Sequence, residues 1–246
     1  MNEQPHFILD GRRVPFEDGQ TLMTAAPEAG VYIPHLGFNP ELTPHGSCRV
    51  CLVKVNGRVQ AACTTPAAAG LTVQSEIEEL RELRRGILQM LFVEGNHVCP
   101  ACEKSGACQL QAVAYYVGML APHYTHFYPR HPVDASHPEA VIDFNRCILC
   151  ELCVRASRDV DGKNVFAIQG RGLQARLVVN TPSGQLGATS FSIDDKAAQV
   201  CPTGTILIKH RGYETPIGQR LYDRKPISMV GDVAQVPESQ GGRRHD

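Results

Sequence analysis

Ten cysteines fall into three groups, and their spacing constrains this 246-residue chain more than any other feature. One group has three cysteines, each separated from the next by two residues, and a Cys-Pro pair far downstream. Each of the other two groups has a C-x2-C pair and one later cysteine. The groups are Cys147, Cys150, Cys153 with Cys201; Cys99, Cys102 with Cys108; and Cys48, Cys51 with Cys63. Cysteine at this density is typical either of disulfide-bonded proteins or of metal sites.

The bulk composition favours metal sites over disulfides. Lys and Arg number 24 against 25 Asp and Glu, so no charge excess indicates nucleic acid or a membrane surface. No apolar run approaches the ~18 residues of a spanning helix, and the first residues lack the basic and apolar segments of a signal peptide. We therefore expect a cytoplasmic protein, in a reducing compartment where disulfides are rare.

The group that ends at Cys201 has the ligand spacing of a [4Fe–4S] cluster. In ferredoxins the run C-x2-C-x2-C presents three thiolates from one tight turn, and a Cys-Pro completes the set. A structural zinc site takes two cysteines from each of two knuckles and has little use for a third at this spacing. The sequence therefore predicts a [4Fe–4S] cluster held by Cys147, Cys150, Cys153 and Cys201.

The second group has three cysteines and needs a fourth ligand. His97 lies two residues before Cys99, and imidazole replaces thiolate in some iron–sulfur centres. Three thiolates and one imidazole also suit zinc, but a chain that already carries one cubane cluster favours iron. We predict a second [4Fe–4S] cluster on His97, Cys99, Cys102 and Cys108.

The first group along the chain is similar to the plant-type [2Fe–2S] pattern but lacks its upstream cysteine. Three clusters need twelve ligands, and ten cysteines plus His97 supply eleven. His35 and His45 both lie in the loop before Cys48 and are candidates for the remaining position. From the residues alone, either histidine, a ligand from solvent or a lost cluster remains possible.

The N-terminal residues read as a small sheet with one helix. Residues 6–17 and 51–60 are expected to form hairpins around Asp10–Gly11 and Asn56–Gly57, dipeptides typical of two-residue hairpin turns. Residues 21–30 are expected to form a short helix that ends at a glycine.

A long helix is predicted over residues 75–95. Ser75 and Glu78 match a capping box, Gly95 marks the end, and apolar residues recur at helical spacing. This stripe consists of Ile77, Leu80, Leu83, Ile87 and Leu91. We interpret the helix as a packing element between two modules.

The second half of the chain alternates irregular and strand-like segments. Residues 123–138 are rich in His and Pro and predict an irregular connector. Residues 170–175 match the dinucleotide pattern G-x-G-x-x-A, but β-formers follow in place of the helix that must hold a pyrophosphate, so a hairpin turn is expected. From residue 222 the tail turns charged and Gly-rich, and its end is predicted to be mobile.

Three motifs in fixed order give the chain a family resemblance. They are GSCRVCLVKVNG with ACTTP, then NHVCPACEKSGACQLQ, then RCILCELCVR with CPTGTI. Together they resemble the N-terminal part of the large iron–sulfur subunit of respiratory NADH dehydrogenase, and the same order occurs in iron-only hydrogenases. The short length and the segment RGYETPIGQRLYD are most similar to the small diaphorase (gamma) subunits of NAD-reducing nickel–iron hydrogenases. The resemblance covers residues 5–224.

The resemblance implies an α+β fold of three modules and a tail. These are a β-grasp, ferredoxin-like [2Fe–2S] domain (1–74), a small helical domain with the His-ligated [4Fe–4S] cluster (75–122), a ferredoxin-like [4Fe–4S] domain (139–212) and a C-terminal tail (213–246).

The resemblance also implies an electron-transfer subunit with no catalytic site of its own. A partner diaphorase subunit would carry FMN and bind NAD(H), and hydrogenase small and large subunits would carry the nickel–iron site. This chain would relay electrons between them, with no nucleic acid and no membrane span involved. The matching subunit of a formate dehydrogenase or of a respiratory NADH dehydrogenase is the alternative. A zinc-stabilised interaction protein is the alternative from another class.

Two departures from the family pattern concern ligands. Respiratory subunits write H-x3-C, whereas His97 and Cys99 form H-x-C, a form that the hydrogenase-type subunits share. The family's upstream cysteine falls at Gly37 in this chain. We predict that His35, two residues away and on the same side of an extended segment, supplies the missing [2Fe–2S] ligand, with His45 as its rival.

Overall fold

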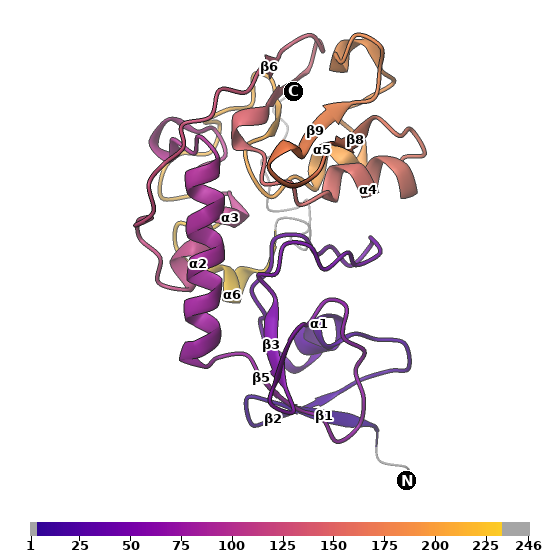
Figure 1. Cartoon of the computed structure of the whole chain (residues 1–246), viewed down its shortest axis with the longest axis vertical. Coiled ribbons are helices and arrows are strands. Elements are labelled where there is room, and N and C mark those ends of the chain that lie inside the picture. The colour runs from indigo at the N-terminus through magenta and orange to yellow at the C-terminus, as the bar shows by residue number, and fades with distance from the viewer. Residues whose placement is uncertain (1–3, 233–246) are drawn as a thin grey trace.

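The computed structural model describes residues 4–232, so the end of the tail that was predicted to be mobile (233–246) lies outside the described residues. Figure 1 shows the N-terminal module at one end of the molecule and the C-terminal module at the other. One long helix, α2 (Glu78–Glu94), runs alongside. This mixture of small sheets and helices agrees with the predicted α+β class.

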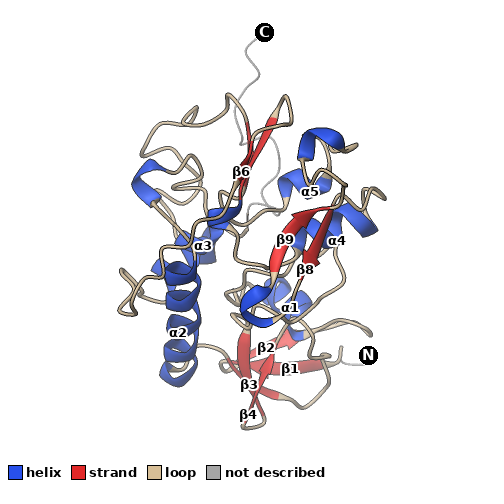
Figure 2. Ribbon diagram, turned by 45° about the horizontal axis from the view of Figure 1, so that its top comes forward, coloured by secondary structure: helices blue, strands red, loops and turns tan. Residues whose placement is uncertain are grey.

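Five strands form the N-terminal sheet in the order β2-β1-β5-β3-β4. Only β1 and β5 pair in parallel, and the other neighbours are antiparallel. A short helix buries Leu22 and Met23 in the core of the sheet with Phe7 and Val53. Figure 2 shows this helix against the strands. The elements are β1 His6–Leu9, β2 Arg12–Pro15, α1 Leu22–Ala25 with a 3-10 turn Ala26–Ala29, β3 Leu52–Val55, β4 Arg58–Ala61 and β5 Thr72–Gln74.

Both predicted hairpins are present, and their turns use residues that tolerate a left-handed backbone. Asp10 and Gly11 have φ of 48° and 79°, and Asn56 and Gly57 have φ of 46° and 85°. Such pairs build the two-residue turn whose twist matches two antiparallel strands. The turns therefore set the register of β1 with β2 and of β3 with β4.

The predicted capping box of α2 is wrong. The N-cap is Ile77, which makes no side-chain cap bond. Ser75 is buried instead, and its hydroxyl accepts a hydrogen bond from Nη2 of Arg84 at 2.9 Å. Arg84 also donates to the carbonyls of Val50 and Leu52. The Ser75 hydroxyl therefore serves as a hydrogen-bond acceptor for a buried guanidinium and does not cap the helix.

The predicted apolar stripe of α2 is wrong in part. Leu83 is 44% exposed, whereas Leu80, Arg84 and Leu88 form the buried face. Ile87 is half-buried against the same core. An arginine takes a core position here because backbone carbonyls satisfy its donors, a case that apolar periodicity does not include.

Two shorter helices pack next to α2. They are α3 (Gln109–Tyr116) and α6 (Ile227–Val230). Leu110 of α3, Ile227 of α6 and Leu88 of α2 belong to one apolar cluster. The tail therefore supplies part of the core around α3.

The C-terminal module contains two small sheets and two short helices. One sheet has the order β10-β7-β6, and the other is the hairpin β8-β9, which Figure 2 shows beside α4. The connector 123–138 is irregular except for β6, as predicted. The elements are β6 Val133–Asp134, β7 Ala140–Asp143, α4 Leu152–Asp159, β8 Phe166–Gln169, β9 Arg176–Val179, α5 Lys196–Gln199 and β10 Ile206–Ile208.

The dinucleotide-like segment 170–175 is a hairpin turn, as expected. β8 and β9 pair antiparallel on either side of it. Between them the chain forms only a 3-10 turn, Gly172–Gln174.

Residues 213–232 fold back onto the segment that carries the second cysteine group. The hydroxyl of Tyr213 donates to the carbonyl of Ala101 at 2.9 Å. Nη1 of Arg220 donates to the carbonyl of Ser105 at 3.1 Å. Over this length the tail is part of the folded structure.

Candidate iron–sulfur sites

All four cysteines of the C-terminal group line one cavity. Cys147 and Cys150 come from the loop that leads into α4, Cys153 lies in the first turn of α4, and Cys201 follows α5. Leu149 and Glu151, which lie between the first three cysteines, have left-handed φ of 52° and 61° and bend the chain tightly. The structure thus brings together the predicted [4Fe–4S] ligands Cys147, Cys150, Cys153 and Cys201.

Burial and backbone amides both act on these sulfurs. Burial raises the pKa of the Cys147 thiol to about 12, although the amide of Leu149 donates a hydrogen bond to it. The backbone amides of Leu152 and Val154 likewise donate hydrogen bonds to Cys150 and Cys153. Burial again raises the pKa of both thiols. Because iron binds thiolate, loading this site releases protons. Hydrogen bonds to the sulfurs are one of the features that set a cluster's potential.

The second cysteine group lines another cavity together with His97. Cys99 begins a 3-10 turn, Cys99–Ala101, and Cys108 immediately precedes α3. The ring of Phe92 lies 5.3 Å from the His97 ring, centroid to centroid. The structure thus also brings together the second predicted ligand set: His97, Cys99, Cys102 and Cys108.

His97 has the environment of a metal-binding imidazole. Its Nε2 is buried without a hydrogen-bond partner, and the ring bonds to the carbonyl of Leu91, which leaves Nδ1 as the donor. Burial lowers the pKa of His97 to about 4, so the ring is neutral at neutral pH. A neutral ring with one nitrogen held by a carbonyl and the other free is the usual state of a ligand histidine. These residues fit an iron ligand set, and their ligand roles stay a prediction.

Two glycines allow close approach to this site. A Cβ at Gly95 would lie 2.5 Å from Nε2 of His97. A Cβ at Gly204 would lie 2.9 Å from Sγ of Cys102. Neither space admits a larger residue without moving a predicted ligand.

One four-residue segment touches both four-ligand cavities. It begins at Cys201, which lines the C-terminal cavity. The carbonyl of Pro202 accepts hydrogen bonds from the amide of Gln109, at 2.9 Å, and from Sγ of Cys108, at 3.6 Å. Gly204 then lies against Cys102. The two sites are therefore separated by little more than this segment.

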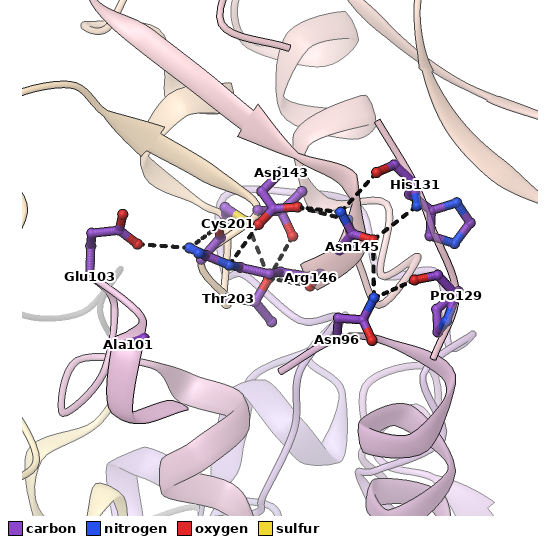
Figure 3. A network of polar contacts seen from close by, with 12 residues as sticks. Asn96, Ala101, Glu103, Pro129, His131, Asp143, Asn145, Arg146, Cys201 and Thr203 are labelled. Carbon is purple, nitrogen blue, oxygen red and sulfur yellow. Dashed lines mark hydrogen bonds and ion pairs between the residues drawn. The ribbon is translucent and has the colours of Figure 1, made fainter. Parts of the chain in front are cut away.

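A polar network ties the two ligand loops together (Figure 3). Arg146, which precedes the first cysteine of the C-terminal group, bonds Glu103 at 2.8 Å and Asp143 at 2.9 Å. On the other side, the amide of Asn96 donates to the carbonyl of Asn145 at 2.8 Å. Since Asn96 directly precedes His97 and Glu103 directly follows Cys102, these bonds hold the second ligand set in position relative to the first.

The three N-terminal thiols divide into a pair and a single thiol. Cys51 and Cys63 are buried and share a side-chain hydrogen bond. Cys48 lies instead beside Gly37, where an added Cβ would be 3.4 Å from the Cys48 sulfur. The position that the family resemblance assigns to a cysteine thus adjoins Cys48.

His35, the first candidate for the fourth ligand, has both ring nitrogens engaged in hydrogen bonds. Nδ1 of the buried His35 bonds the carbonyl of Ile33 at 2.8 Å, and its Nε2 bonds the carboxylate of Asp232. His45 is about half exposed, and its Nε2 lies 3.9 Å from a carboxylate oxygen of Glu151. An imidazole bound to iron through one nitrogen keeps only the other for hydrogen bonding. The ligand role predicted for His35 therefore has no support from this arrangement, and the roles of both His35 and its rival His45 stay untested.

The described residues show no single-ion site and no membrane span. Among residues 4–232, no three His, Cys, Asp or Glu side chains lie close enough to hold one metal ion. Cluster ligands, in contrast, surround a group of several irons. Within the same residues no helix is both long and apolar enough to cross a membrane.

Three family models match successive parts of the chain. They describe a 2Fe-2S iron–sulfur cluster binding domain (3–78), an NADH-ubiquinone oxidoreductase-G iron–sulfur binding region (84–123) and a 4Fe-4S single cluster domain (141–208). The gamma subunit of the NAD-reducing hydrogenase HoxS of Cupriavidus necator is 42% identical over 220 residues, which are 89% of this chain and 93% of that subunit. The chain belongs to this family of hydrogenase gamma subunits.

Other relatives are consistent with this family membership. A solved chain of an NAD+-reducing [NiFe]-hydrogenase in the H2-reduced state is 50% identical, with a TM-score of 0.91 over 96% of this chain and all of that one. The alpha subunit of the NADPH-Fe(3+) oxidoreductase of Geobacter sulfurreducens is 32% identical over 203 residues, which are only 24% of its length. The 78 kDa subunit of the Candida albicans NADH-ubiquinone oxidoreductase is 31% identical over 205 residues, 28% of its length. These longer relatives match this gamma-type chain over part of their length.

Several residues that shape the sites of this gamma-type subunit could not be identified from the sequence pattern. Asp232 carries no local signal, because its partner His35 lies 197 positions away. Gly95 was read only as a helix end. Gly204 follows directly after the Cys-Pro-Thr run, and that position was the available signal.

Proposed function

We propose that this chain relays electrons between an FMN-carrying, NAD(H)-binding diaphorase subunit and a nickel–iron hydrogenase small and large subunit pair. The observation that carries the proposal is the contact of one segment, 201–204, with both four-ligand cavities. Two redox groups held this close, in a chain of the hydrogenase gamma-subunit family, suit single-electron transfer from one to the other. When bound, the iron–sulfur clusters supply the redox chemistry, and the protein tunes it.

The chain's own residues bury the ligand sulfurs and fix their surroundings. Amide donors at Leu149 and its neighbours would stabilise reduced, more negative clusters. The neutral imidazole of His97 would hold one fewer negative charge at its site than a thiolate would, which raises the potential relative to an all-thiolate site. The two cavities therefore differ in charge as well as in position.

The cysteines also support a cytoplasmic location for the complex. All ten are unpaired thiols in this fold. Unpaired thiols at this density are typical of a reducing compartment. The division into modules 1–74, 75–122, 139–212 and the tail 213–246 is part of the same proposal.

The relatives favour a hydrogenase partner over the alternatives. The family match spans 93% of a hydrogenase gamma subunit, whereas the matches to respiratory and NADPH-linked subunits span about a quarter of their length. The zinc-stabilised interaction protein would need single-ion sites, and residues 4–232 contain no such group.

The test removes one ligand and separates the partial reactions of the purified complex. We expect Cys108→Ala to reduce H2-dependent NAD+ reduction at least about tenfold, because relay through its site is lost. Hydrogen oxidation with a viologen dye, and NADH oxidation with ferricyanide, should stay near wild type. Ser105→Ala, in the same loop, is the matched control. Equal loss of all three activities would instead show damage to assembly, and unchanged H2-dependent NAD+ reduction would contradict the relay.

A further inference from the structure

The positions of the three N-terminal thiols indicate which iron of a [2Fe–2S] cluster each would bind. A [2Fe–2S] cluster takes two ligands on each iron. Cys51 directly precedes β3 and Cys63 follows two residues after β4, the strand that pairs with β3, so we assign these two neighbouring thiols to one iron. Cys48 has Gly37 beside it, and the Cβ of any other residue there would lie 3.4 Å from both Cβ and Sγ of Cys48. The iron held by Cys48 is therefore the one without a second thiolate.

The two candidate histidines differ in their contacts: His35 is engaged elsewhere, and His45 lies about half exposed with its Nε2 3.9 Å from Glu151. His35 has hydrogen-bond partners on both ring nitrogens, Ile33 and Asp232. The carbonyl of His35 accepts from Nε2 of Gln109 at 3.0 Å, and the same nitrogen bonds Asp232 at 3.1 Å. This buried set of bonds holds the imidazole on the side of α6, so turning it toward Cys48 would break them.

The surroundings of Gly37 favour a negatively charged ligand. Arg155 of α4 is 3% exposed and donates from Nη2 to the Gly37 carbonyl at 2.7 Å. Its other hydrogen bonds go to the carbonyls of Thr43, at 2.7 Å, and Cys150, at 3.5 Å. Its Nε is buried without a partner. A buried cation bonded to carbonyls alone is stabilised by a nearby anion.

We infer that the [2Fe–2S] site of this chain has only three protein ligands, and that a small anion from solution completes it next to Gly37. This inference rests on the proposed iron–sulfur role of the chain. The anion is either derived from water or a small solute such as a thiolate. With only Cys48, Cys51 and Cys63 as protein ligands, this [2Fe–2S] site then differs from the family pattern of four thiolates.

The experiment is pulsed EPR on the reduced, purified complex, at a temperature where the fast-relaxing [4Fe–4S] signals have broadened away. The variants are wild type, His35→Gln, Gly37→Cys and Gly37→Ala. An added Cβ meets only ordinary to tight contacts at this position, and Gly37 does not have a left-handed φ, so both Gly37 variants are expected to fold. Gly37→Ala is the matched control, because it adds the Cβ without the thiolate.

Beyond the iron of the partner subunits, we expect about ten irons for this chain in the wild type, from two cubanes and one [2Fe–2S] centre, and no strongly coupled nitrogen. Gly37→Cys should change the g-values, because a protein thiolate then replaces the anion from solution, while Gly37→Ala and His35→Gln leave the g-values unchanged. Coupling to ¹⁷O from labelled water identifies a water-derived anion, and its absence identifies a solute anion.

Two results would overturn the inference. A strongly coupled nitrogen that disappears in His35→Gln makes His35 the fourth ligand, and about eight irons per chain means that the N-terminal site holds no cluster. Both leave the proposed relay intact, since the two cubanes remain. Failure of the relay itself would appear differently, as near-zero iron or as unchanged H2-dependent NAD+ reduction in Cys108→Ala.

Discussion

At the scale of single residues, small changes in volume decide whether a ligand reaches its site. Gly95 has an extended backbone, φ −107°, so it is not required for a left-handed conformation. It is required for space, because a Cβ would lie 2.5 Å from Nε2 of His97 and 3.0 Å from the carbonyl oxygen of Asn145. The residue that ends α2 thus also makes room for a predicted ligand.

We predict that Gly95→Ala displaces the His97 ring and costs the chain about four irons, the content of one [4Fe–4S] cluster. Iron and acid-labile sulfide per chain, with EPR of the reduced complex, measure this. Gly86→Ala is the matched control within α2, because its Cβ would meet only Tyr124 Oη at 3.8 Å. That change should stabilise α2 by up to about 1 kcal/mol. Full iron content in Gly95→Ala would show that His97 does not bind iron.

At the scale of elements, the helix α6 and Asp232, two residues after it, connect the C-terminal segment to the N-terminal module. Asp232 bonds both His35 and Gln109, and all three are buried. Although burial itself lowers the pKa of His35, the charge and hydrogen bond of Asp232 raise it above its ordinary value. The pair therefore holds the C-terminal segment against a loop that carries Gly37.

We predict that Asp232→Ala loosens α6, because it leaves His35 and Gln109 buried without this partner. Breaking one member of a buried ion pair costs about 3–5 kcal/mol. Hydrogen exchange of residues 227–232 in the purified complex should then be faster than in the wild type. Met229→Ala, at a residue 75% exposed on the same helix, is the control and should leave the exchange rate unchanged. Equal protection in both variants would show that the pair does not hold the helix.

At the scale of the whole molecule, the modules differ in the size of their sheets, although the buried core of each includes predicted cluster ligands, Cys51 and Cys63 in the N-terminal one. The C-terminal core includes Cys150, Cys153 and Cys201 among its buried residues, and its sheets have only two and three strands. The N-terminal module has a five-stranded sheet with a core of its own, centred on Phe7 and Val53. The two small sheets of the C-terminal module bury too little apolar area to be stable alone.

We predict that removing iron, with an anaerobic chelator treatment of the purified complex, destabilises residues 141–208 more than residues 6–74. Hydrogen exchange before and after the treatment measures the difference, because metal binding and folding are coupled where ligands form the core. Restoring iron and sulfide should recover the protection of 141–208. Equal loss of protection in both modules would mean that the N-terminal core also depends on its cluster.

Features set by neighbouring residues were predictable from the sequence alone. The hairpin turns at Asp10–Gly11 and Asn56–Gly57 follow from which residues accept a left-handed backbone. The grouping of the ten cysteines, and of His97 with the second group, follows from how many residues separate them. Covalent geometry limits how far apart such ligands can lie, so spacing already indicates which of them share a site.

Only the tertiary structure decided which distant partner each side chain or segment contacts. Arg84 occupies the core of α2 because carbonyls from another module satisfy it. His35 was the predicted ligand, yet a carboxylate 197 positions away bonds its Nε2. Segment 201–204 lies between two cavities because distant loops converge there. A side chain's hydrogen-bond partner depends on what folding brings within about 3 Å, and no local spacing contains that information.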